Sequence, residues 1–149
     1  MIFDRTKEDV ELAAKIVQEK IRAFLPTTEE ENGILSRGIL GIESLNRIEA
    51  AQEVLFEKLK SWGYWGNFSK NKTWKNGDFF TKKDFERILE NIEKARTAFF
   101  AKKDTPAVPS AVYHYSAFND IEKNIYDLND LFEDMVENVK ECGNAMCGG

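Results

Sequence analysis

Three stretches of the chain repeat apolar residues at alternating intervals of three and four positions. Residues spaced in this way share one face of an α-helix, so each stretch predicts a helix with one apolar side. Such a helix is unstable alone in water and must bury that side against another element. The chain must therefore fold by packing helices together. The apolar positions are Leu45, Ile48, Leu55, Leu59 and Trp62, with Gln52 between them; Phe85, Ile88, Ile92, Ala95 and Phe99; and Phe118, Ile121, Ile125, Leu128, Phe132, Met135 and Val139.

We predict an all-α fold, an antiparallel helical bundle of four long helices plus one short helix. Each of the last three helices would be about 30 Å long at about 1.5 Å per residue. Equal lengths suit antiparallel packing with crossing angles of about +20°. A bundle domain over residues 1–141 and a flexible, glycine-containing tail over residues 142–149 would complete the chain. The long helices are expected over residues 6–25, 42–62, 81–102 and 119–141, and the short one after Thr27 or Thr28.

Length and charge exclude several classes of protein. A chain of 149 residues is the size of one ordinary domain. Its formal net charge of −5 disfavours binding to a nucleic-acid backbone. No apolar run is long enough to span a membrane, and the N-terminus lacks the pattern of a secretory signal peptide. We therefore expect no nucleic-acid partner, no membrane insertion and synthesis in the cytoplasm.

The predicted loop between the third and fourth helices, residues 62–80, is the most unusual segment, because it contains all three tryptophans of the chain and several lysines. Exposed aromatic faces could bind a protein partner, or stack on sugars or bases. Alternatively, the rings fold inward and close one end of the bundle, because a loop of this length needs a core of its own. The candidates for partner or sugar binding are Trp62, Tyr64, Trp65, Phe68, Lys72, Trp74 and Lys75.

The two cysteines, Cys142 and Cys147, have Cys-x4-Cys spacing in the last eight residues. A structural zinc site needs four ligands, and His114 is the only histidine, so two free thiols or a local disulfide are favoured over a metal site. A contact between Cys142 and His114 would be needed for a thiol nucleophile, yet a helix C-terminus raises a thiol pKa. We identify no catalytic residue and expect no enzyme activity, no metal and no cofactor.

The last predicted helix is acidic, with eight carboxylates against two lysines between residues 120 and 141. A charge run on a helix usually forms a solvated face. The alternative is a docking surface for a basic partner, such as the lysines near the aromatic loop of a neighbouring copy. The carboxylates are Asp120, Glu122, Asp127, Asp130, Glu133, Asp134, Glu137 and Glu141.

Short segments spread over nearly the whole chain, in this order, resemble small helical proteins and modules encoded among the tail and baseplate genes of phages and prophages of Gram-positive bacteria. The resemblance implies a structural or host-contact role in the virion and supplies no catalytic residues. The segments are Ile2-Phe3-Asp4-Arg5-Thr6 with Asp9-Val10, Leu45-Asn46-Arg47-Ile48-Glu49, Gly63-Tyr64-Trp65, Lys72-Thr73-Trp74, Phe85-Glu86-Arg87-Ile88-Leu89-Glu90-Asn91, Ala98-Phe99-Phe100, Asp104-Thr105-Pro106 with Pro109, Asp120-Ile121-Glu122-Lys123, and Glu141-Cys142-Gly143 with Cys147-Gly148.

We therefore predict a non-enzymatic accessory domain of a phage tail or baseplate, assembled in the host cytoplasm and located in the virion. It would act by protein–protein binding to other tail or baseplate proteins, through the aromatic loop or the acidic helix, and it could form a homo-oligomer. One alternative is a carbohydrate-binding module that contacts the cell surface through the same loop. A second alternative is a thiol redox protein that uses the C-terminal cysteine pair.

Overall fold

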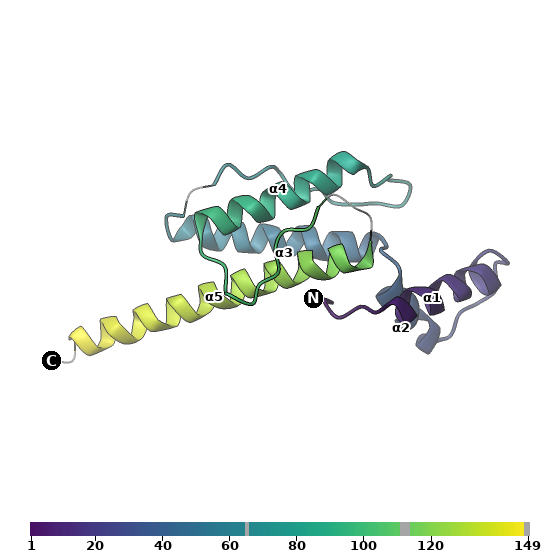
Figure 1. The fold of residues 1–149 in the computed structure, drawn as a ribbon, viewed down its shortest axis with the longest axis horizontal. Helices are drawn as coiled ribbons and strands as arrows, with labels where there is room; N and C mark the ends of the chain where they lie inside the picture. The colour runs from purple at the N-terminus through teal and green to yellow at the C-terminus, as the bar shows by residue number, and fades with distance from the viewer. Residues whose placement is uncertain (65, 111–113, 148–149) are drawn as a thin grey trace.

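The computed structural model describes residues 1–64, 66–110 and 114–147, with side chains up to residue 144. Within these residues every regular element is a helix and no strand occurs, which confirms the all-α prediction. The elements, shown in Figure 1, are α1 (Lys7–Ile16), the π-helical turn η1 (Val17–Ile21), α2 (Glu29–Gly38), α3 (Ile42–Ser61), α4 (Lys82–Ala98) and α5 (Tyr115–Cys147).

The three longest helices, α3, α4 and α5, run in the same direction. Near their N-terminal ends, Arg47 of α3 donates to Glu122 of α5 at 3.0 Å. Further along, Lys58 of α3 donates to Glu133 of α5 at 2.7 Å. Figure 1 shows α4 running alongside both. The antiparallel packing that we expected is therefore not what the structure has.

Parallel packing is possible because the connections are long. Residues 62–81 and 99–114 lead from the end of one helix back to the start of the next. An extended chain covers about 3.3 Å per residue, whereas an α-helix rises about 1.5 Å per residue. We call the unit formed by α3, α4 and α5 the body. Each connection is long enough to return along the whole length of the body, and Figure 1 shows both doing so.

The first two helices form a separate hairpin and do not join the bundle as a fourth long helix. The hairpin lies at the end of the molecule where α3 and α5 begin (Figure 1). A Cβ atom at Gly38 of α2 would lie 2.2 Å from the carbonyl oxygen of Asp9 and 2.5 Å from the Cβ of Ala13. The missing side chain therefore lets the two helices approach closely. The first helix is also shorter than predicted, because α1 ends at Ile16 and passes into η1.

The core of the body consists of two neighbouring apolar clusters that use the predicted stripes. Both combine residues from α3, α4 and α5, so each helix contributes along its length. The last helix begins earlier and extends further than predicted, from Tyr115 to Cys147. The first cluster contains Ile48, Phe85, Ile88, Leu89, Ile92, Ala117, Phe118, Ile121 and Ile125, and the second Leu55, Phe56, Leu59, Ala95, Phe99, Leu128 and Phe132.

A buried ion pair attaches the N-terminal segment to the body. The Glu122 carboxylate is fully buried and accepts from Arg5 Nη2 at 2.7 Å as well as from Arg47. Arg5 also donates through Nε to the carbonyl oxygen of Arg37 at 3.1 Å, which connects the hairpin to α5. Asn119 completes the attachment, because its side chain both accepts from and donates to the backbone of Arg5.

Glu122→Gln should lower the free energy of unfolding by about 3 kcal/mol, because it leaves two arginines beside a neutral group in a buried site. The matched control is Glu137→Gln, an exposed acid on the same helix, which should change the free energy by less than about 0.5 kcal/mol. Urea unfolding measures both values. Equal values for the two variants would contradict the structural role assigned to Glu122.

The hairpin turn contains a backbone conformation that is unfavourable for its residue. Phe24 has φ of 53°, in the left-handed region where glycine is usual, and its side chain is 96% exposed. The N–H of the next residue, Leu25, donates to the carbonyl oxygen of Lys20 at 2.9 Å and ends the helical segment. This turn is formed at the expense of local strain.

Phe24→Gly should raise the free energy of unfolding by up to about 1 kcal/mol, because glycine adopts this conformation without a steric penalty. Leu25→Gly, one residue further at an ordinary φ, should lower it. Thermal unfolding of both variants tests the assignment. A loss of stability in Phe24→Gly equal to that in Leu25→Gly would show that the turn is not strained.

Candidate functional site

The aromatic loop, residues 62–80, packs several of its described rings against the body. The ring of Phe68 stacks on Phe56 of α3 with centroids 3.9 Å apart and planes 6° apart. Tyr64 meets the ring of Phe99 edge-on at 5.0 Å, and Trp74 is only 3% exposed. Three of the predicted binding candidates thus contribute to the core or its margin, as in the alternative in which the rings fold inward.

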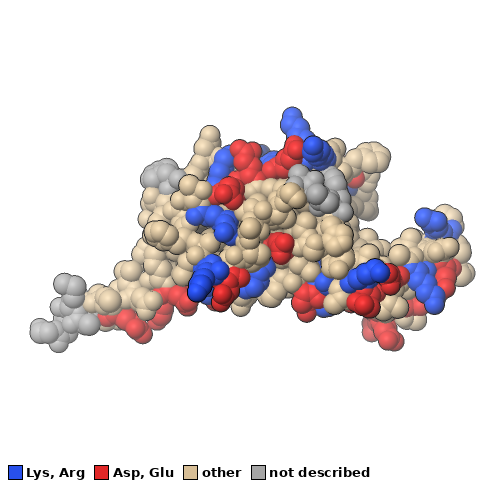
Figure 2. Space-filling model, viewed as in Figure 1, with Lys and Arg blue, Asp and Glu red and all other residues tan. Residues whose placement is uncertain are grey.

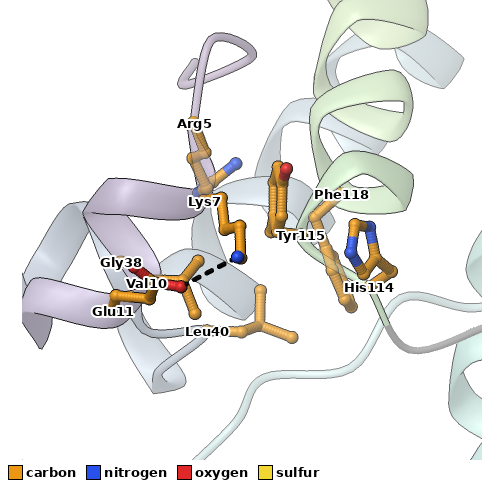
Figure 3. A pocket seen from close by; sticks show the side chains of 9 residues that line it. All are labelled: Arg5, Lys7, Val10, Glu11, Gly38, Leu40, His114, Tyr115 and Phe118. Atoms are coloured by element: carbon orange, nitrogen blue, oxygen red, sulfur yellow. Dashed lines mark ion pairs between the residues drawn. The ribbon is translucent and has the colours of Figure 1, made fainter. Parts of the chain in front are cut away.

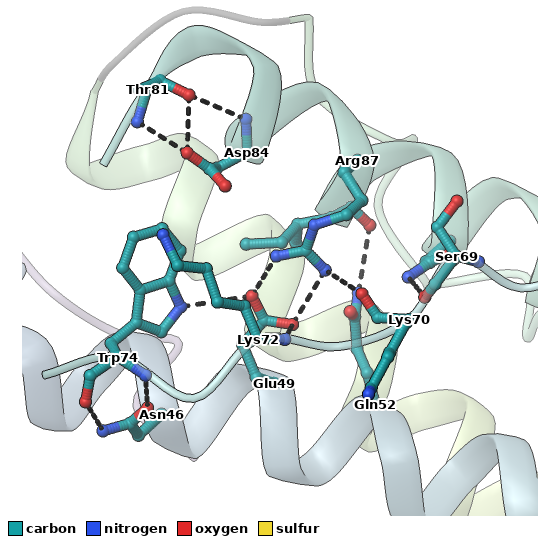
Figure 4. A network of polar contacts seen from close by, with 12 residues as sticks. Asn46, Glu49, Gln52, Ser69, Lys70, Lys72, Trp74, Thr81, Asp84 and Arg87 are labelled. Atoms are coloured by element: carbon teal, nitrogen blue, oxygen red, sulfur yellow. Dashed lines mark hydrogen bonds and ion pairs between the residues drawn. The ribbon is translucent and has the colours of Figure 1, made fainter. Parts of the chain in front are cut away.

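Two asparagine side chains bind the loop backbone. Asn46 of α3 accepts from the N–H of Trp74 at 2.7 Å and donates to the carbonyl oxygen of the same residue at 3.0 Å (Figure 4). Asn91 of α4 accepts from the N–H of Ser69 at 2.8 Å and donates to the carbonyl oxygen of Ser69 at 2.9 Å. A loop without secondary structure has backbone groups that need partners when buried. These two side chains supply such partners, one from α3 and one from α4.

A buried carboxylate joins α3, α4 and the loop. Glu49 of α3, 2% exposed, accepts from Arg87 of α4, from the indole Nε1 of Trp74 at 3.2 Å and from the backbone N–H of Lys72 at 3.3 Å (Figure 4). The ammonium group of Lys72 lies 3.9 Å from the centre of the Trp74 ring, a cation–π contact. Lys72, a predicted binding candidate, is therefore engaged within the chain.

The end of the loop is fixed by the cap of α4. Thr81 accepts from the N–H of Asp84, and the Asp84 carboxylate accepts from the N–H of Thr81 at 3.0 Å. This reciprocal pair is a capping box. Burial raises the pKa of Asp84, whereas the hydrogen bonds from Thr81 lower it. Together the lowering effects are larger, so that the carboxyl pKa lies below its ordinary value. The cap is therefore ionised at neutral pH.

Only part of the predicted contact surface is exposed. The side chain of Trp62 is 42% exposed, and its ring meets Phe132 of α5 edge-on at 6.0 Å. Phe79 is 85% exposed, and Lys75, four residues earlier in the chain, is exposed as well. Trp65 lies outside the described residues. The outward surface of the loop thus consists of fewer rings than the sequence suggested.

The described first part of the second connection, residues 99–110, is held on α5 in a similar way. The carbonyl oxygen of Pro106 accepts from Arg96 of α4 at 2.8 Å and from Asn124 of α5 at 3.0 Å. Thr105 donates to the buried carboxylate of Asp127 at 2.8 Å. One backbone carbonyl and one side chain of this connection therefore form hydrogen bonds with side chains of α4 and α5.

The acidic residues of α5 fall into two groups: some are paired inside the molecule, and others are exposed. Glu122 and Asp127 are buried and paired inside the molecule. Asp130 accepts from Lys102 of the second connection, and this hydrogen bond raises the pKa of the lysine. The remaining exposed acids lie toward the C-terminal end, at Glu133, Asp134, Glu137 and Glu141.

A cavity of about 440 Å³ lies where the hairpin meets the start of α5 (Figure 3). Its apolar walls include Val10, Leu40 and Phe118, while Lys7 and Glu11 form an ion pair of 3.1 Å at its side. Sequence analysis missed this cavity because it combines three segments distant in the chain. Arg5, His114 and Tyr115 also line the cavity, so its wall combines apolar and polar side chains.

The cysteine and the histidine are far apart. His114 precedes the first turn of α5, whereas Cys142, an exposed free thiol, lies near the other end. At about 1.5 Å per residue these positions are about 40 Å apart, so they cannot form a nucleophile–base pair within one chain. The side chain of Cys147, and hence the predicted local disulfide, lies outside the described residues.

The described part of the chain also bears on metal binding and on membrane insertion. No three histidine, cysteine, aspartate or glutamate side chains there gather in an arrangement suited to a metal ion. None of the helices there combines the length and apolar character that crossing a bilayer requires. A comparison of the chain with protein-family models, with curated proteins and with solved structures found no match.

Asn91→Ala should lower the free energy of unfolding by about 1–3 kcal/mol, because it leaves both backbone groups of Ser69 without their partner. It should also speed hydrogen exchange at the amide of Ser69. Asn67→Ala, an exposed asparagine of the same loop, is the matched control and should leave both measurements near those of the parent chain. Unchanged exchange at Ser69 in Asn91→Ala would contradict the anchoring role.

Proposed function

We propose that the chain is a non-enzymatic structural or host-contact domain of a phage tail or baseplate and acts by protein–protein binding. The buried polar groups described above hold two long connections in place, which is a structural role for these residues. The resemblance of the short segments to tail and baseplate modules gives the setting. The partners would be other tail or baseplate proteins, and the location the virion.

The observation that carries the binding role is the anchoring of the aromatic loop. Asn46, Glu49 and Asn91 hold its backbone on α3 and α4, while Trp62 and Phe79 face outward. A binding surface held in one conformation before contact loses less entropy on association. Exposed aromatic rings are among the residues that contribute most to protein interfaces.

The two alternative functions have less support. A carbohydrate-binding module would need open aromatic faces, and among the described tryptophans only Trp62 is substantially exposed, since Trp74 is buried. A thiol redox protein would use the pair of Cys142 and Cys147, and of these two side chains the structure describes only that of Cys142, an exposed free thiol. Protein–protein binding is therefore the function that we retain.

The test uses phage particles purified from the host bacterium after induction. The chain should co-purify with tails, as measured by mass spectrometry of density-gradient fractions. Phe79→Ser should reduce its incorporation at least tenfold while its free energy of unfolding changes by less than about 0.5 kcal/mol. Phe100→Ser, an equally exposed ring on the second connection, is the matched control and should be incorporated normally. A chain that stays in the cytosol while particles form without it would contradict the proposal.

A further inference from the structure

The C-terminal part of α5 extends beyond the body. α3 ends at Ser61 and α4 at Ala98, whereas α5 continues to Cys147, and Figure 1 shows it projecting alone. The last contacts with the body are made by Met135, whose sulfur accepts from the hydroxyl of Tyr64 at 3.4 Å, and by Val136, which packs against the second cluster. Beyond them Val139 is 51% exposed and Cys142 is exposed.

The apolar seam of α5 does not stop where the body stops. Phe132, Met135, Val139 and Cys142 continue the 3-4 spacing that buries Phe118 to Leu128 inside the body. A seam with this spacing is the pattern by which one helix packs along another. The projecting part therefore presents to solvent the same face that α5 buries against α3 and α4.

The positions beside this seam carry no charge. In a heptad that places Phe132 and Val139 at a and Met135 and Cys142 at d, all charged residues of the segment fall on the outer face. Figure 2 shows the acidic side chains gathered along one edge of this projection. The flanking e and g positions are Leu131, Val136, Asn138 and Gly143, whereas Glu133, Asp134, Glu137, Lys140 and Glu141 occupy positions b, c and f.

We propose that the projecting part of α5 pairs with the same segment of a second copy of this chain. Charges at e and g positions normally select or reject a partner helix. An uncharged flank allows two identical faces to meet without repulsion, although the segment itself is acidic. A basic partner helix, by contrast, would find its counter-charges on the outer face, away from the contact.

The two helices must be antiparallel. Within the body the seam side of α5 is already occupied by α3 and α4, which contribute Leu59 and Ala95 to the second cluster. A parallel partner would have to place its own α3 and α4 in that occupied space. An antiparallel partner places its body beyond the C-terminal end of the first α5, so that the two projections overlap and the bodies lie at opposite ends.

The overlap is short, so the dimer is weak. The exposed part of the seam, from Val139 onward, spans fewer residues than an isolated helix pair needs for high stability. Interfaces of this size belong to transient associations. The chain is therefore expected to be a monomer at low micromolar concentration and to dimerise as the concentration approaches the millimolar range.

Sedimentation equilibrium of the purified chain tests the pairing. Between about 10 µM and 1 mM the average mass should rise from 17.1 kDa toward twice that value. Val139→Glu should weaken the association at least tenfold, whereas Asn144→Glu, which adds the same charge at an outward f position, should weaken it less than threefold. A monomer throughout this range, or equal effects of the two variants, would overturn the proposal. The proposal does not rest on the virion role, because the measurement uses the isolated chain.

The orientation has a separate readout. A spin label at Ser116→Cys, with both native cysteines replaced by alanine, reports the distance between the two α5 starts in a dimer. An antiparallel pair that overlaps only the free segments beyond Val136, and is therefore centred near Cys142, should give about 80 Å at about 1.5 Å per residue. A distance within about 20 Å would overturn the antiparallel arrangement.

Discussion

Helices that run in the same direction need connections that return along the whole length of the body, and this constraint governs the rest of the structure. A returning segment that is neither helix nor strand brings backbone N–H and C=O groups onto an apolar surface, where each needs a partner. Side chains of the helices provide these partners. Asn46 and Asn91 bind the first connection, and Arg96 with Asn124 binds the second.

The same constraint explains why Asn91 and Asn124 lie among the core positions. Gln52, Asn91 and Asn124 are fully buried. Asn91 and Asn124 bind connection backbone, and Gln52 donates to the carbonyl oxygen of Ile88 of α4 at 3.0 Å. Their role is to hold main chain in place, and none of them lines the cavity near the hairpin. The surfaces that we propose for function lie on the outside, at the aromatic loop and along the projecting part of α5.

The sequence predicts the elements of this fold better than their arrangement. The apolar stripes indicate α3, α4 and α5 because one-sided spacing is a property of a single helix, and Thr6 and Thr81 mark helix starts through local caps. A stripe is the same whether its neighbour runs parallel or antiparallel, so direction could not be read from it. The length of the two connections was the available signal. The buried Trp74 and the cavity of Figure 3 depend on how distant segments meet, which no local pattern specifies.

The common direction of α3, α4 and α5 is the central claim, and a distance measurement between paired spin labels tests it most directly. In a chain without its native cysteines, labels at Lys60→Cys and Thr97→Cys would sit near the C-terminal ends of α3 and α4, and labels at Lys60→Cys and Lys82→Cys at opposite ends. The structure predicts that the first pair is closer by roughly 20 Å, which is most of the length of α4 at about 1.5 Å per residue. A shorter distance for the second pair would mean that α3 and α4 are antiparallel and would contradict the account.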